Sequence, residues 1–474
     1  MALSTSSDIY RRAIFSLHKS YFANKYLEEF IKLQKEGRIP HWSLSYMLPE
    51  RTYQELNKDQ KKFVDSTESG RLHLIAEEKY LELRKNPKKF AATSRQLLDQ
   101  CHDALIFEQS DLDVLNAEII RNELQIVRHR LNAPQFVDKG LMREVTNRYQ
   151  HTVGFKNVRL IESLEFKDNE PLSTVYEKCL AFLRQQGYEM IVKPKSEASS
   201  IGVDIFSTSR GATHANLEER LKNYLKDQEF HISKLIFQSF VPGRVFRLDG
   251  YISNGKVISA FLNHGAPNPF EYYQRQCTRI QISDNAEQIV PGRAIGQEIC
   301  DAFNYRNGIF HIEFIRLRHA AQKDDIFFLE IAARPGGLFN MFPHYPYPFQ
   351  RIHLLSMLGE ELPENPAPIE GEFATVHFCP LNPRLHGLQQ ILLKNLDLPQ
   401  IGSIIDSCKV VEAYQNFKSL EENCCTGLLP RAIACIVLKT SNRDLKHLRN
   451  VAEKLAKKVE ASIKIVSLDD NKLK

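Results

Sequence analysis

The first 130 residues alternate between two hydrophobic patterns. Short apolar runs predict strands, and the segments between them have apolar residues at helical spacing, which predicts amphipathic helices. The predicted strands span residues 13–20, 41–47, 71–75 and 104–108, and the predicted helices span 24–36, 87–101 and 112–131. We expect Asp111 to be the N-cap of the last helix. Alternating strands and helices are typical of a parallel sheet, so this part predicts a small α/β domain.

The pattern changes from about residue 134. After a helix predicted at 138–149, a region richer in strand-like runs extends to about 335. Beyond Pro380 the chain returns to a mixed α/β pattern that ends in a helix predicted at 444–460. We therefore predict an α/β fold with an α+β core. Its three parts are residues 1–130, 131–375 and 376–474.

Composition bears mainly on the classes of partner and the compartment. The 474 residues have the ordinary make-up of a soluble globular protein, and the net charge of +5 does not demand a nucleic acid or an anionic membrane as partner. No apolar run reaches the length of a membrane span, and we find no secretory signal. The nine cysteines form no CxxC pair, so we expect reduced thiols in a cytoplasmic protein.

One segment resembles a phosphate-binding loop. Residues 250–257 nearly match the Walker A pattern, but Val257 occupies the position of the Ser or Thr that binds magnesium. Asn254-Gly255 also lies between strand-like runs at 245–251 and 256–262, which predicts a hairpin turn. Because no GxGxxG follows a strand either, we reject both a P-loop and a dinucleotide site.

Two other segments carry candidate chemistry. A predicted strand delivers Lys193 to a loop of small polar residues, where backbone N–H groups and the lysine could hold an anion. In HIEF, His311 and Glu313 share one strand face, and a hairpin with FFLEIAAR would bring Glu330 beside Glu313. Paired carboxylates need a cation between them, and magnesium that bridges nucleotide phosphates is a natural candidate. A structural role for Lys193 and two merely exposed glutamates stay open as alternatives.

In order, VKP…SSIGV, FQSFVPG, HIEF and LEIAARPGG resemble the ATP-grasp superfamily, and more narrowly its carboxylate–amine ligases such as the L-amino-acid ligases. Asp138-Lys139 with Met142-Arg143 resembles the segment that opens the nucleotide domain in that family. The resemblance is strongest over residues 104–340. It implies a Rossmann-like pre-ATP-grasp domain at 1–130, a nucleotide-binding and catalytic core at 131–375, and an α/β segment at 376–474 that completes the site.

The resemblance also implies roles for individual residues. The implied ATP contacts are Lys139 and Lys193 at the phosphates, Ser199, Ser200 and Gly202 in a loop that covers them, and Gln238, Ser239, Phe240 and Val241 at the adenine. The implied metal ligands are Glu313 and Glu330, and the groups implied to stabilise the transferring phosphoryl group are Arg334 and His311. The implied cofactors are ATP and Mg²⁺, with two ions expected and Mn²⁺ as an alternative.

Three positions depart from the family pattern. Gln238 stands where relatives often have Glu, and Val245 stands where many have a ribose-binding Glu or His. Ala332 replaces an Asn that binds the second magnesium in many relatives, although the amino-acid ligases often have Ala there. The ribose contact and the second metal therefore stay open.

The substrate contacts are less defined by the pattern. We slightly favour Asp249 as an ordinary polar residue at a strand end, and we expect a substrate loop at 263–273. Four arginines could bind a substrate carboxylate or be solvated, and the pattern leaves both readings open: Arg244, Arg247, Arg275 and Arg279.

The sequence predicts an ATP- and magnesium-dependent ligase that activates a carboxylate as an acyl-phosphate and joins it to an amine. We expect small-molecule substrates, no nucleic acid and no membrane partner, and the sequence is compatible with a homodimer. Two alternatives remain. One is carboxylation of a small molecule in the biotin-carboxylase manner, and the other is a non-catalytic nucleotide-binding module, for which Val245 and Ala332 argue.

Overall fold

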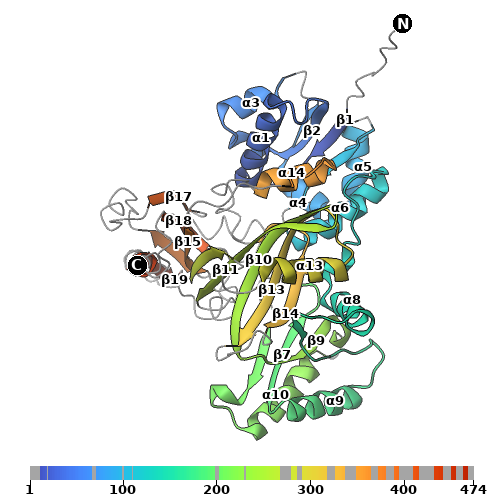
Figure 1. The fold of residues 1–474 in the computed structure, drawn as a ribbon, viewed down its shortest axis with the longest axis vertical. Coiled ribbons are helices and arrows are strands. Elements are labelled where there is room, and N and C mark those ends of the chain that lie inside the picture. Colours follow the sequence, from blue (N-terminus) through green and yellow to red (C-terminus); the bar gives the residue numbers. More distant parts are fainter. Residues whose placement is uncertain are drawn as a thin grey trace.

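A computed structural model gives the fold (Figure 1). It describes residues 11–18, 20–66, 71–98, 101–108, 110–197, 202–228, 231–266, 279–285, 291–317, 326–336, 349–364, 372–380, 389–393, 409–415, 432–440, 450–454 and 463–467. Among these residues, no helix combines the length and the hydropathy that crossing a membrane requires.

The N-terminal part contains a four-stranded parallel sheet with the strand order β3-β2-β1-β4, which confirms the predicted parallel α/β pattern. Its strands are β1 (Arg11–Phe15), β2 (Trp42–Pro49), β3 (Leu72–Ile75) and β4 (Ala104–Ile106). Its helices are α1 (Ser20–Lys35), α2 (Glu50–Gln54), α3 (Lys58–Val64), α4 (Glu77–Lys85), α5 (Pro87–Leu98) and α6 (Asp111–Leu124).

Both ends of α6 differ from the sequence-based prediction. The N-cap is Ser110, whose hydroxyl accepts a hydrogen bond from the Asp113 N–H, so the expected Asp111 cap is wrong. The helix ends at Leu124 because Gln125 adopts the left-handed conformation at φ +59°. Asp111 is thereby the first helical residue, and its carboxylate is available to another partner.

Alternating side chains of the N-terminal sheet bury both of its faces. Ala13 and Phe15 point into one apolar cluster with α1, whereas Ile14 points into the cluster formed with α5 and α6. The first cluster also contains α14 (Phe349–Leu358), which lies between β14 (Ile326–Ala332) and β15 (Glu372–Pro380) in the chain but packs beside α1 and β4 (Figure 1). The predicted boundary at residue 375 stays a prediction.

The central sheet has nine strands in the order β17-β18-β15-β12-β11-β10-β13-β14-β5. They are β5 (Arg159–Leu160), β10 (Gly243–Ser253), β11 (Lys256–Ala266), β12 (Arg279–Asn285), β13 (Gly308–Leu317), β14 (Ile326–Ala332), β15 (Glu372–Pro380), β17 (Lys409–Gln415) and β18 (Ala432–Thr440). Asn254 and Gly255, at φ +50° and +77°, form the turn between β10 and β11, which confirms the predicted hairpin. Apolar residues of α13 (Gly292–Ala302) and α8 (Lys139–Thr152) pack with β10 and β13 in one cluster.

A smaller sheet of four strands has the order β6-β9-β7-β8 and is covered by two helices (Figure 1). Its strands are β6 (Ser163–Leu164), β7 (Glu189–Pro194), β8 (Asp204–Ser207) and β9 (Leu235–Ser239), and the helices are α9 (Leu172–Gln185) and α10 (His214–Asp227). The other described elements are α7 (Pro134–Val137), the short 3₁₀ turns η2 (Thr208–Arg210) and η3 (Ile232–Lys234), and the pair β16 (Gln389–Leu393) and β19 (Ile463–Ser467). Of the helix predicted at 444–460, only residues 450–454 are described, and they are helical.

Candidate active site

The two candidate metal ligands lie opposite each other on neighbouring strands. Glu313 on β13 is the register partner of Glu330 on β14, directly before an irregularity in the pairing. The predicted antiparallel pairing of the two strands is thus confirmed, with the two glutamates in register. Their side chains are 14% and 27% exposed, so both can reach a ligand on this face of the sheet.

Lys139 reaches the same place from α8. Asp138 caps this helix by accepting hydrogen bonds from the N–H groups of Gly140 and Leu141, which fixes Lys139 as its first residue. The Lys139 Nζ donates to the carbonyl oxygen of Glu197 at 2.6 Å and lies 3.7 Å from Glu330 Oε2. An ammonium group therefore stands beside one of the two carboxylates.

Lys193 projects from β7 of the smaller sheet and is only 7% exposed. Burial lowers the pKa of Lys193 to about 8, and the positive charge of Lys139 acts in the same direction, whereas Glu330 and Glu313 oppose the shift. The lysine is therefore held in a poorly solvated position where an anionic ligand would stabilise its charge.

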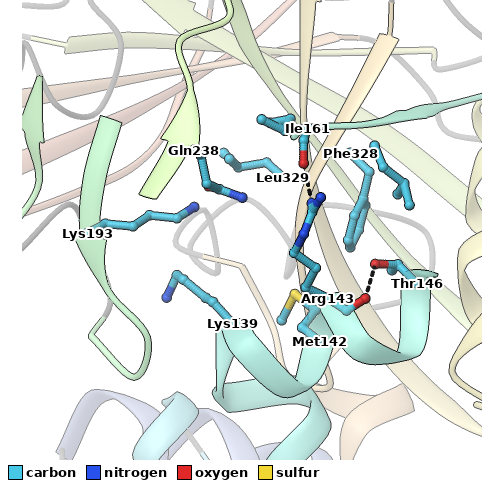
Figure 2. Close-up of a pocket in the computed structure, with 10 residues that line it drawn as sticks. Lys139, Met142, Arg143, Thr146, Ile161, Lys193, Gln238, Phe328 and Leu329 are labelled. Atoms are coloured by element: carbon cyan, nitrogen blue, oxygen red, sulfur yellow. Dashed lines mark hydrogen bonds between the residues drawn. The ribbon is translucent and has the colours of Figure 1, made fainter. Parts of the chain in front are cut away.

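A small pocket opens beside these lysines, between the nine-stranded central sheet and the smaller sheet that contains β7 and β9. Figure 2 shows Lys139, Lys193 and Gln238 reaching toward one space from α8, β7 and β9. The pocket is lined by Lys139, Met142, Arg143, Thr146, Leu160, Ile161, Lys193, Gln238, Phe328 and Leu329. It thus combines three cationic side chains, those of Lys139, Arg143 and Lys193, with an apolar wall, which suits a ligand with a phosphate end and a flat apolar end.

The segment predicted to hold adenine borders this pocket. Val241 packs with Ile161 and Ile315 in an apolar cluster. The N–H groups of Ser239 and Phe240 donate to the carbonyl oxygens of Glu162 at 3.0 Å and Glu189 at 3.2 Å. Those two amides are committed within the fold, so neither is available to read a base edge.

His311 lies inside a polar network rather than at an open surface. Its Nδ1 is 2.8 Å from Asp249 Oδ1, and its Nε2 is 3.5 Å from Glu313 Oε1. Burial disfavours the imidazolium, but the two carboxylates outweigh burial and raise the pKa of His311 to about 9. Asp249 is 1% exposed and lies within β10, so its interpretation as an ordinary polar residue at a strand end is wrong.

The structure places Arg247, one of the four candidate arginines, in the site. Its Nε donates to Glu313 Oε1 at 2.7 Å. Although burial raises the pKa of Glu313, the Arg247 and His311 charges dominate and hold that pKa well below its usual range. Arg275 and most of the predicted substrate loop lie outside the described residues, and so do Ser199 and Ser200.

Gly202, from the predicted phosphate loop, is described. It has φ +67°, and a Cβ there would lie 2.7 Å from Pro194 Cγ, so glycine is required by both conformation and space.

Arg334 follows β14 and is anchored to Asp111, the first residue of α6. Its Nε and Nη2 donate to the two oxygens of Asp111 at 2.8 and 2.6 Å, and its Nη1 donates to the Pro335 carbonyl. Burial opposes both charges, but their attraction prevails, so the pKa of Arg334 is raised and that of Asp111 is lowered. The sequence pattern does not predict the pairing of Asp111 with Arg334, because the two residues are 223 positions apart.

The acidic residues fit a magnesium ion that arrives with a nucleotide. Arg247 and His311 both contact Oε1 of Glu313, which leaves Oε2 as the oxygen that can face a metal. Within the described part of the chain, no group of three or more His, Cys, Asp or Glu side chains could hold a metal alone. Two carboxylates completed by phosphate oxygens are a usual environment for Mg²⁺.

Comparisons with known proteins agree with this geometry. Residues 186–340 match the family model described as the ATP-grasp domain, which confirms the predicted resemblance. No curated protein matches the sequence.

Solved structures with a similar fold cover nearly the whole chain. An L-amino acid ligase from Bacillus licheniformis has a TM-score of 0.62 at 11% identity, with 96% of this chain and 98% of that chain covered. A biotin carboxylase–β,γ-ATP complex from Campylobacter jejuni has a TM-score of 0.60 at 13% identity, with 98% and 93% covered. An N5-carboxyaminoimidazole synthase from Aspergillus clavatus, in complex with ADP and 5-aminoimidazole ribonucleotide, has a TM-score of 0.59 at 13% identity, with 94% and 99% covered. At these identities the likeness establishes the fold.

Proposed function

Because this chain has the ATP-grasp fold and carries an ATP-grasp domain at residues 186–340, we propose that it is an ATP- and magnesium-dependent ligase that joins a carboxylate to an amine. One observation carries the proposal. Glu313 and Glu330 face each other in register, with Lys139 beside them and Lys193 across the pocket between the two sheets. Alternating cations and carboxylates of this kind suit a polyphosphate with its metal.

Nucleotide binding would use both ends of the pocket. The apolar wall that includes Ile161 and Leu329 would take the adenine, while Lys139 and Lys193 would take the phosphates. Glu313 and Glu330 would hold Mg²⁺ through their carboxylates. When bound, the ion would neutralise charge on the phosphate oxygens during phosphoryl transfer.

The proposed reaction has two steps. A substrate carboxylate oxygen attacks the γ-phosphorus of ATP, the bond to the β-phosphate oxygen breaks, and an acyl-phosphate and ADP form. An amine then attacks the acyl carbon and loses a proton to solvent, and inorganic phosphate leaves with the bonding electrons. Arg334 is oriented by Asp111 and would stabilise negative charge on the transferring group, since such transfers depend mostly on positioning and charge neutralisation.

The test is phosphate release from Mg-ATP with pools of amino acids, amines and small carboxylates. Each active pair would be checked by mass for a product equal to the two inputs minus water. We expect E313A and E330A to abolish turnover. The control is E298Q, because the Glu298 carboxylate is buried outside the site, where it accepts hydrogen bonds from the N–H groups of Lys156 and Asn157. Full activity in both glutamate variants would contradict the metal assignment.

Carboxylation is the second candidate, because similar folds include a biotin carboxylase and an N5-carboxyaminoimidazole synthase. Phosphate release that requires bicarbonate, with no amine incorporated, would favour it over the ligase. Tight ATP binding with no turnover against any pool would instead favour a non-catalytic module.

A further inference from the structure

A row of buried polar side chains crosses the central sheet next to the two glutamates. On β11, Asn263 is the register partner of Arg247 on β10, which is in turn the partner of Glu313 on β13. Two residues along β10, Asp249 is the partner of His311. Because side chains alternate along strands and register partners share a face, all five lie on the face that carries Glu313 and Glu330.

These side chains are linked by direct contacts. Asn263 Nδ2 donates to Asp249 Oδ2 at 2.6 Å, and Asp249 Oδ1 lies 2.8 Å from His311 Nδ1. The other imidazole nitrogen, Nε2, faces Glu313 Oε1 at 3.5 Å. The linked residues Asn263, Asp249 and His311 are 0%, 1% and 4% exposed, so water does not compete for these contacts. Both nitrogens of the imidazole are thereby engaged, and its plane is fixed.

The orientation of the Asn263 amide favours its hydrogen bond to Asp249. Its Oδ1 is buried and has no hydrogen-bond partner among the residues that the structure describes. An unpaired buried carbonyl oxygen costs free energy, since it has given up water without a replacement. The amide tolerates this cost while its Nδ2 holds one oxygen of Asp249, which leaves the other oxygen of Asp249 directed at His311.

The backbone at Gly336 closes the network from outside. A Cβ at Gly336 would lie 2.3 Å from Asp249 Oδ1 and 2.4 Å from His311 Nδ1. Only glycine can approach so closely, so the chain just after Arg334 packs directly over the Asp249–His311 contact. Packing of this kind restricts the imidazole further.

We propose that Asn263 and Asp249 are positioning residues, which hold the His311 imidazole and, through it, the Glu313 carboxylate in the orientation that a magnesium–nucleotide complex needs. The inference rests on the proposed function and deepens it. Outer residues that orient a metal ligand commonly change metal affinity or activity about 10–100-fold when they are replaced. A purely structural polar network would affect stability without such a selective effect.

The first measurement needs no substrate. The affinity of a non-hydrolysable ATP analogue is measured by calorimetry with Mg²⁺ and with EDTA, and the ratio gives the enhancement due to the metal. We expect D249A to reduce this enhancement about ten-fold or more, and N263A to reduce it in the same direction by less. E298Q, the matched buried carboxylate, should leave the ratio unchanged. If D249A does not fold, N263A alone decides the question.

The second measurement observes the imidazole itself. In protein labelled with ¹⁵N-histidine, the Nδ1–H of His311 should give a slowly exchanging proton signal, assigned by its absence in H311Q. We expect D249A to lose this signal and E298Q to keep it. Wild-type signal and metal enhancement in both D249A and N263A would overturn the proposal, and so would loss of the signal with unchanged enhancement. If the wild type turns over no substrate, the proposed function fails, but both readouts still test the positioning.

Discussion

Replacing Lys193 with Met should stabilise the protein while removing its capacity to bind nucleotide. Lys193 is 7% exposed, and burial lowers its pKa from the ordinary 10.5 to about 8. At about 1.36 kcal/mol per pH unit, this difference means that the buried charge costs about 3 kcal/mol at neutral pH. Methionine has a similar length and no charge, so K193M should avoid most of this cost.

The sign of the pH dependence follows from the same shift. Because the folded pKa of Lys193 lies below the unfolded one, the unfolded chain binds more protons between about pH 8 and pH 10.5. The contribution of Lys193 to the free energy of unfolding therefore rises with pH across this window. Below pH 8 the penalty is fully present, and K193M should remove both the penalty and its pH dependence.

The assay is urea denaturation of wild type and K193M at pH 7 and pH 10. We expect the midpoint of K193M to be higher at pH 7 and the two midpoints to converge at pH 10, while K193M loses affinity for Mg-ATP. The control is K195M, because Lys195 pairs with Glu165 at 2.8 Å and its replacement should not stabilise. A K193M protein less stable than wild type at pH 7 would refute the reasoning.

Three further predictions concern charged residues. D111N should lower kcat about ten-fold or more with a nearly unchanged KM for ATP, because Arg334 loses charge-assisted hydrogen bonds. Steady-state kinetics measures both constants, and an unchanged kcat would contradict the prediction. E108Q should destabilise the fold by about 3–5 kcal/mol, because the fully buried Arg121, 2.5 Å from Glu108, would keep an unpaired charge. Denaturation experiments measure the difference, and equal stability of E108Q and wild type would contradict the prediction. Mg-ATP binding near pH 8 should take up protons at Lys193, seen as buffer-dependent heats in calorimetry, and K193R should abolish the uptake.

Local pattern was sufficient for most of the elements and for the glutamate pair. The β10–β11 hairpin follows from Asn254-Gly255, because these two residues tolerate the positive φ angles of a tight turn. The pairing of Glu313 with Glu330 follows from two apolar strands joined by a polar segment, since a hairpin fixes which residues face each other. These are properties of neighbouring residues in the chain.

The start of α6 shows where local pattern failed. An acidic residue before an apolar helix is a usual N-cap, so the pattern predicts a cap at Asp111, yet Ser110 caps the helix and Asp111 binds Arg334. Nothing within one or two helical turns of Asp111 distinguishes the two outcomes. The choice depends on a guanidinium that the central sheet delivers from another part of the chain.

The sequence by itself therefore determined the alternation of strands and helices, the hairpins and the resemblance to the ATP-grasp superfamily, because each depends on residues close together in the chain or on motifs in order. Only the tertiary structure decided that Asp249 and Asn263 are buried beside His311 and that Arg247 neutralises Glu313. Strand register across the sheet sets those contacts, and register between distant strands depends on the packing of the whole core.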